Sequence, residues 1–134
     1  MDQVRWKQRF ENFSNGFMRF QSIRSAHLQD PTSELAKLAL IQSFEFTFEL
    51  AWKTLKDFLV YQGVEVALPR EVIKQAFKFN VLREGQTWID MLSDRNRLSH
   101  EYSEARTMVI VEKIATIYYD AMKVLIDDMA ERAK

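Results

Sequence analysis

The chain has 134 residues, of which 47% are hydrophobic, 13% aromatic and 28% charged. This composition predicts one folded domain over residues 1–134 with a large apolar core. Three glycines, no cysteine and two histidines exclude a glycine-rich phosphate loop, a disulfide framework, a thiolate zinc site and a metal cage of histidines. We therefore expect neither a metal nor a cofactor.

The charges balance, with nineteen basic and nineteen acidic side chains. No global field then attracts the chain to nucleic acid or to anionic lipid, so a contact with nucleic acid would depend on a local patch. The amino terminus lacks the apolar stretch of a secretory signal, and no apolar run approaches the ~20 residues that cross a bilayer. These features predict a soluble cytoplasmic protein that has no membrane contact.

The first predicted element is a long helix that ends before Asp30-Pro31. Its aromatic residues recur at steps of three and four, which places five of them on one face: Trp6, Phe10, Phe13, Phe17 and Phe20. Gly16 interrupts the helix, at a cost of about 1 kcal/mol relative to alanine, but the stripe keeps its phase across it. We expect one helix with a core-facing or dimer-facing stripe. His27, near its end, is expected to be solvated or to cap the helix.

The second predicted helix runs from Glu34 to Gln62, a stretch without glycine or proline, and Thr32 or Ser33 is its expected N-cap. The segment 44–50 alternates apolar and polar residues like a strand. Apolar residues of the longer stretch nevertheless form a helical stripe: Leu38, Ile41, Phe48, Trp52, Leu55 and Leu59. A helix that is apolar on more than one side is expected to lie centrally. Glu45 shares this stripe and needs a partner.

Three further helices complete the prediction. Proline at position 69 suits the first turn of a helix that reaches about Phe79, and Gly85 precedes a fourth. A fifth begins near Glu104 and continues to the end, with one apolar stripe: Val111, Ile114, Tyr118, Ala121, Leu125 and Met129. The fold class is therefore all-α, an antiparallel bundle of four to five helices.

The candidate site lies at the end of the fourth helix, in Asp94–Tyr102. Arg95 offers a fixed cation, Asn96 an amide, His100 a group that titrates near neutrality and Tyr102 a phenol. This set suits a phosphate-containing ligand, because a guanidinium binds phosphate through paired hydrogen bonds. If the ligand is RNA, His100 transfers a proton and Arg95 stabilises the charge that develops on phosphorus, without a metal.

A purely structural interpretation of the same residues stays open. An arginine on an interface-facing position often bridges carboxylates, and Glu45 is the expected partner of Arg95. A histidine at a helix end often caps carbonyl groups. The spacing alone does not separate these alternatives.

Four segments carry a resemblance to a known family. RNRLSHEY (Arg95–Tyr102) fits the R-x4-H-x-Y signature of HEPN domains found beside minimal nucleotidyltransferases. IQSFEFTFELAWKTLKDFL (41–59), PREVIKQAF (69–77) and WIDMLSDRN (88–96) follow that family's order. The chain thus resembles the nucleotidyltransferase substrate-binding HEPN family, which includes the HepT-like members of toxin–antitoxin pairs.

The resemblance implies a helical bundle that forms a homodimer or a higher oligomer and brings two motifs to a shared cleft. It implies pairing with a separately encoded minimal nucleotidyltransferase, and binding of a nucleotide or another substrate by Arg95, Asn96, His100 and Tyr102. In related toxin–antitoxin pairs the HEPN member is a metal-independent ribonuclease, so that Arg95 and His100 would be catalytic. Tyr102 would then be the tyrosine that the partner modifies with AMP to silence the nuclease.

Nucleotidyltransferase chemistry itself is expected in another chain. Such an enzyme needs a Gly-Ser turn and closely spaced aspartates, and this sequence has neither Gly-Ser nor Asp-x-Asp. Three hypotheses remain: a binding subunit of a nucleotidyltransferase, a ribonuclease restrained by that partner, or a structural adaptor with a degenerate motif. Whether the chain is an enzyme stays open at this point.

Overall fold

The computed structural model describes residues 2–100 and 103–134, and all regular structure in these ranges is helical. The elements are α1 (Asp2–Gln29), α2 (Glu34–Tyr61), α3 (Pro69–Lys78), α4 (Gly85–Leu98), α5 (Glu104–Lys113), the π-helical segment η1 (Ile114–Tyr118) and α6 (Tyr119–Arg132). The predicted all-α bundle is confirmed. The strand-like alternation of residues 44–50 lies in the middle of α2, so the helical interpretation of that segment is also confirmed.

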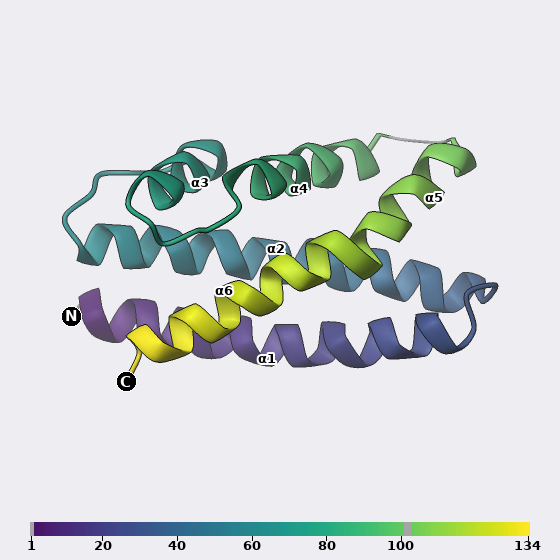
Figure 1. The fold of residues 1–134 in the computed structure, drawn as a ribbon, viewed down its shortest axis with the longest axis horizontal. Helices are drawn as coiled ribbons and strands as arrows, with labels where there is room; N and C mark the ends of the chain where they lie inside the picture. Colours follow the sequence, from purple (N-terminus) through teal and green to yellow (C-terminus); the bar gives the residue numbers. More distant parts are fainter. Residues whose placement is uncertain (1, 101–102) are drawn as a thin grey trace.

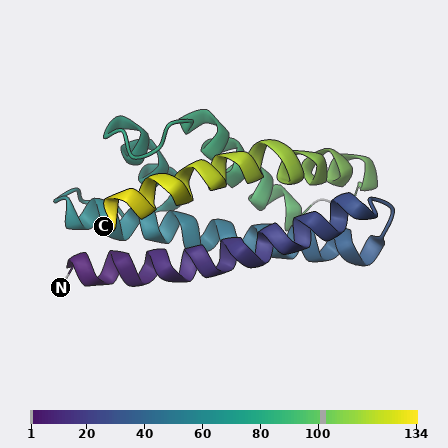
Figure 2. The same cartoon turned by 60° about the horizontal axis from the view of Figure 1, so that its bottom comes forward.

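The two longest helices, α1 and α2, lie side by side along their whole length and run antiparallel (Figure 1). Helices α3 and α4 follow the opposite side of α2, and α6 crosses over the α1–α2 pair. The two termini lie at the same end of the molecule, as Figure 2 also shows. Helix α2 is therefore central, as its apolar character predicted. In the described ranges, no helix combines the length and the apolar composition that crossing a bilayer requires.

Local signals in the sequence explain where α2 begins and ends. The Ser33 hydroxyl accepts the Ala36 N–H at 3.1 Å, which confirms one of the two predicted N-caps. At the other end Gly63 takes a φ of +87°, a conformation that favours glycine. This turn lets the Val64 N–H donate to the Leu59 carbonyl at 2.9 Å and satisfy an end group of the helix.

Aromatic side chains from several helices pack around α2. Four of the five predicted aromatics of α1 are fully enclosed, and Phe10 is half-buried. From α2, the Phe44 ring stacks on Tyr118 with centroids 5.6 Å apart, and the Phe48 ring stacks on Trp88 at 6.0 Å. The α1 stripe is therefore core within the chain, and the centre of α2 joins the fourth helix to the fifth.

The buried arc of α2 is displaced from the predicted stripe. Leu40, Phe44 and Ala51 are fully buried, whereas Leu38 is 63% exposed. The predicted apolar stripe through Leu38 therefore follows the edge of the buried arc and not its centre. Glu45 shares this edge and is only half-buried.

Gly16 marks a close approach of α1 to α2. A Cβ atom at this position would lie 2.8 Å from Leu50 Cδ1, closer than carbon atoms pack. The Gly16 carbonyl also accepts the Thr47 hydroxyl at 3.4 Å. Tight packing against α2 thus offsets the helix cost of this glycine, and α1 continues through it as predicted.

The predicted fifth helix is continuous but contains an irregular turn. It comprises α5, η1 and α6, and the whole predicted apolar stripe is buried. The wider π turn brings both Tyr118 and Tyr119 into the core, and the Arg24 side chain donates to the Ala115 carbonyl within it at 2.6 Å. π turns often mark functional regions, and this one faces α4, which carries the candidate motif.

Candidate functional site

The candidate site begins with the last two turns of α4. Trp88, Met91 and Leu92 anchor this helix in the core, so the residues that follow them are held on a rigid element. The helix ends at Leu98, and the His100 N–H donates to the Arg97 carbonyl at 2.9 Å in the following turn. The motif therefore spans the boundary between a fixed helix and the turn that leaves it.

Arg95 lies against α2 and is partly buried, with 26% of its side chain exposed. Its Nη1 donates to Glu49 Oε2 at 2.5 Å, and its guanidinium carbon lies 5.6 Å from the centre of the Phe48 ring. The expectation that Arg95 bridges a carboxylate of α2 is confirmed, but the partner is Glu49 and not Glu45. Glu49 also pairs with Lys53 at 3.6 Å, so it lies between two cations.

Glu45 interacts with the same arginine electrostatically, without a hydrogen bond or ion pair between the two side chains among the described residues. Burial raises the pKa of the Glu45 carboxyl above its ordinary value, and the positive charge of Arg95 partly counteracts that rise. Arg95 therefore acts on two carboxylates one helical turn apart, bound to one and near the other.

The other predicted site residues are arranged differently. Asn96 and His100 are both exposed. Within residues 2–100 and 103–134, Arg95, Asn96 and His100 form no hydrogen bond or ion pair with one another. Because α4 ends at Leu98, the helical spacing that would place His100 beside Asn96 does not continue to His100. Tyr102 lies outside the described residues.

A buried carboxylate next to Arg95 was missed by the sequence analysis. The Asp94 side chain is 4% exposed, and its Oδ2 accepts the Tyr118 hydroxyl and, at 3.5 Å, the Lys113 ammonium. Burial and the hydrogen bond to Asp94 both raise the pKa of Tyr118, so this phenol remains a proton donor. The Asp94–Tyr118 bond therefore fixes the end of α4 against η1.

A groove opens beside this carboxylate, between α4 and α5. It has a volume of about 540 Å³ and is lined by Asp94, Arg97, Arg106, Val109, Ile110 and Lys113. Of the predicted site residues that the structure describes, Arg95, Asn96 and His100 do not line it. A signal was present in the sequence, since positions 106, 109, 110 and 113 recur at the spacing of one helix face, but only the fold places Arg97 opposite them.

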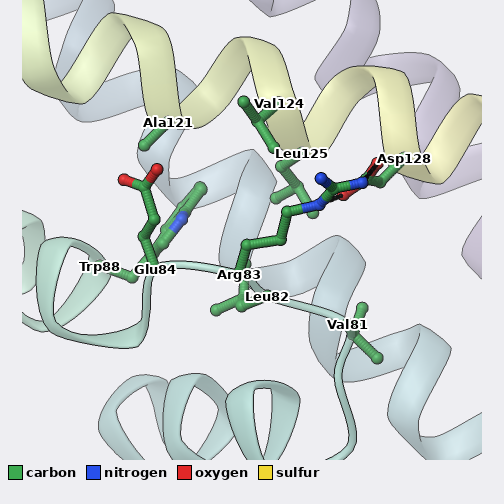
Figure 3. Close-up of a pocket in the computed structure, with 9 residues that line it drawn as sticks. All are labelled: Val81, Leu82, Arg83, Glu84, Trp88, Ala121, Val124, Leu125 and Asp128. Atoms are coloured by element: carbon green, nitrogen blue, oxygen red, sulfur yellow. Dashed lines mark hydrogen bonds and ion pairs between the residues drawn. The ribbon is translucent and has the colours of Figure 1, made fainter.

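A second hollow, shown in Figure 3, is too small for a substrate. The Arg83 guanidinium spans it and binds both carboxylate oxygens of Asp128 at 2.8 Å. Its interior volume is about 10 Å³, room for about one water molecule. Among the described residues, no group of three or more His, Asp or Glu side chains is placed to hold a metal ion. The end of α4 and the adjoining groove are therefore the better candidates for a ligand site.

Two comparisons with known proteins bear on the family of the chain. The sequence model of the family described as "nucleotidyltransferase substrate binding protein like" matches residues 8–131. A curated relative, the probable ribonuclease HepT of Haemophilus influenzae, is 25% identical over 79 residues, which cover 55% of this chain and 54% of the relative. The chain thus spans about half the length of the curated relative it matches.

Proposed function

Because the chain belongs to the nucleotidyltransferase substrate binding protein like family, we propose that it is the HEPN subunit of a two-component system. In this proposal it pairs with a separately encoded minimal nucleotidyltransferase and binds that enzyme's nucleotide or substrate. Arg95, Asn96, His100 and Tyr102 form the binding motif. No catalytic residue of the transferase is needed in this chain.

The observation that carries the proposal is the polar end of α4. Asn96 and His100 are exposed there, next to a guanidinium that Glu49 and Phe48 hold in place. An arginine so restrained loses little side-chain entropy when it binds an anion, and its remaining N–H groups suit phosphate oxygens. Asn96 and His100 add hydrogen-bond donors that are already in solvent.

The test uses the chain and the neighbouring nucleotidyltransferase, co-expressed and purified as a pair. Calorimetric titration with ATP is expected to show binding that falls at least about tenfold in the Arg95→Ala, His100→Ala double variant, the size expected for one lost bond to a charged group. The matched control is Arg70→Ala, Lys74→Ala, which removes two exposed charges from α3. Failure of the pair to form, or equal ATP affinity in all three proteins, contradicts the proposal.

A second candidate function is a metal-independent ribonuclease, favoured by the name of the Haemophilus influenzae relative. The 2′-oxygen of RNA would attack the adjacent phosphorus while the 5′-oxygen leaves. A 2′,3′-cyclic phosphate and a 5′-hydroxyl then result. The exposed His100 imidazole would move the proton, and Arg95 would stabilise the added negative charge on phosphorus. Arg95 can do so only if it shares or releases Glu49.

Expression of the chain without its partner separates the two functions. The ribonuclease predicts growth arrest and RNA fragments ending in cyclic phosphate, both abolished in the Arg95→Ala, His100→Ala variant. Normal growth with intact RNA leaves the binding subunit as the function and removes the nuclease.

Two finer features of the proposal have their own tests. AMP transfer to Tyr102 by the partner predicts a mass gain of one AMP on incubation with ATP, absent in Tyr102→Phe. A homodimer or higher oligomer that brings two motifs together predicts a sedimentation mass of at least twice that of one chain. If the chain is a monomer that still binds ATP, the proposed shared cleft fails while the proposed binding motif stands.

A further inference from the structure

We propose that the groove between α4 and α5 binds a run of successive phosphate groups, as found in an oligonucleotide or a nucleoside triphosphate. The inference rests on the proposed function for its assumption that the ligand carries phosphate. It assigns a second contact surface, formed by Arg97, Arg106 and Lys113, which does not include Arg95, Asn96 or His100. No motif residue among those described lines this groove.

Local charge is the first argument. The chain as a whole carries no net charge, yet among the residues that the structure describes, three cations and one carboxylate line the groove. That carboxylate, Asp94, is enclosed and accepts bonds from Tyr118 and Lys113, so a neighbouring cation balances its charge. Arg97 then adds a positive charge at the groove that no carboxylate among the described lining residues balances, and a local patch attracts anions even though the whole chain is neutral.

Arg97 is the cation best placed to accept a ligand. It is exposed, and among residues 2–100 and 103–134 its side chain has no hydrogen bond or ion pair. It therefore differs from Arg95, two residues earlier, which Glu49 engages at 2.5 Å. A phosphate that approaches the groove meets an arginine that has no bond to break.

The shape of the groove favours an extended anion over a single phosphate. Arg106 and Lys113 are seven residues apart on α5, which is about 10.5 Å along a helix axis. The cations thus line a strip and do not surround one point. The volume of about 540 Å³ falls in the range of about 300–1,000 Å³ typical of small-molecule sites, well above what one phosphate fills.

Apolar surface between the cations suits the rest of such a ligand. Val109 is 58% exposed within the strip, and Ile110 is buried at its base. Successive phosphates would contact the arginines while a ribose or base lies against Val109. An inorganic polyphosphate would use the charges alone.

The experiment measures binding of a fluorescent 12-nucleotide 2′-O-methyl RNA by anisotropy at several salt concentrations. This probe lacks the 2′-hydroxyl that cleavage requires. The Arg97→Gln, Arg106→Gln variant is expected to bind at least about tenfold more weakly, the size of one lost bond to a charged group. Its slope of log affinity against log salt should be smaller by about 1.4, since each phosphate contact on a single strand contributes about 0.7.

The matched control is Arg70→Gln, Lys74→Gln on α3, which also removes two exposed cations and is expected to change neither quantity. Competition by ATP and by inorganic tripolyphosphate identifies the source of the phosphates. Displacement by both supports a general phosphate run, and displacement by neither supports a nucleotide strand. Equal affinity and equal slope in the groove variant and the control would overturn the inference, as would a wild-type chain that does not bind the RNA.

The same assay on Arg95→Ala, His100→Ala separates this inference from the proposed function. If the motif variant loses ATP binding while the groove variant binds RNA like the control, the proposed function stands and the groove assignment fails. If only the groove variant loses RNA binding and the motif variant keeps both RNA and ATP binding, the groove assignment stands and the binding role of the motif fails. A groove variant that no longer binds the nucleotidyltransferase but binds RNA with unchanged affinity would show that the groove contacts the partner protein. That result would overturn the assignment.

Discussion

The α1–α2 pair and the junction of α4 with α5 are built on different physical principles. Between α1 and α2 buried aromatic rings meet, as where Trp6 packs edge-on against Phe58 with centroids 4.9 Å apart, and the Asp57 carboxylate pairs with the solvent-exposed Arg9. At the α4 end, a carboxylate, Asp94, is buried and bound by the Tyr118 hydroxyl. Apolar packing depends on volume and phase, whereas a buried charge depends on one specific partner. The first region therefore makes the scaffold, and the second is where a small change alters chemistry.

Removal of a central ring is expected to have the largest effect. Phe44→Ala deletes a fully buried side chain that stacks on Tyr118, and should lower the free energy of unfolding by about 3–5 kcal/mol. Phe46→Ala is the matched control, because this ring is 56% exposed, and should change stability by less than about 0.5 kcal/mol. Urea denaturation measures both. Similar losses in the two variants would mean that Phe46 is also covered, against the burial described above.

Removal of one hydroxyl tests the polar junction. Tyr118→Phe leaves the Asp94 carboxylate buried with Lys113 as its remaining partner among the described residues, at an expected cost of about 1–3 kcal/mol. Tyr119→Phe is the control, since among the described residues its hydroxyl accepts one bond, from the exposed Gln21 amide at 2.7 Å, and should cost no more than about 1 kcal/mol. Equal losses of unfolding free energy in urea denaturation would show that the hydrogen bond to Asp94 stabilises the fold no more than the bond to Gln21 does.

The smallest expected effect is the pH dependence of stability that Glu45 causes, at the edge of the buried arc of α2. Burial raises the pKa of Glu45, so the folded state holds this proton more tightly than the unfolded state. Stability is therefore lost as pH rises from the ordinary glutamate pKa through the raised one. Glu45→Gln should be more stable than the parent at pH 7, by less than about 1 kcal/mol for a half-exposed group, and the two should converge at lower pH.

Arg95→Ala tests the direction in which Arg95 shifts the pKa of Glu45. Loss of the guanidinium removes the charge that lowers the pKa of Glu45, so that pKa should rise further. Carboxyl carbon shifts in an NMR titration measure it. A pKa that falls or stays unchanged would show that Arg95 does not act on Glu45.

Sequence patterns predicted the scaffold well because helical phase repeats. The stripes of α1 and of the fifth helix are buried as expected, and Ser33 caps α2. The structure differs from the sequence expectation where helical phase alone does not decide which side chains are buried. Leu38 is exposed because its stripe follows the edge of a buried arc, and His27, expected to be solvated or to cap the helix, is 5% exposed, with no hydrogen-bond partner for its Nδ1 among the described residues.

The candidate site was only partly predictable. The sequence indicated that Arg95 faces a carboxylate of α2, but Glu45 and Glu49 are one turn apart on nearly the same face, and spacing cannot choose between them. Neither the Asp94–Tyr118 bond nor the π turn of η1 has a local signature, since both depend on how α4 meets the fifth helix. The roles of Arg95, Asn96, His100 and Tyr102 stay predictions.

By itself, the sequence determined the helices, their order and the position of the polar motif at the end of α4, because these follow from residue spacing and capping along one segment. Only the tertiary structure decided that Glu49 engages Arg95, that Tyr118 donates to Asp94, and that Arg97 shares a groove with Arg106. Each of these pairs joins two different helical elements. Their meeting depends on the angles at which whole helices pack, which no local pattern encodes.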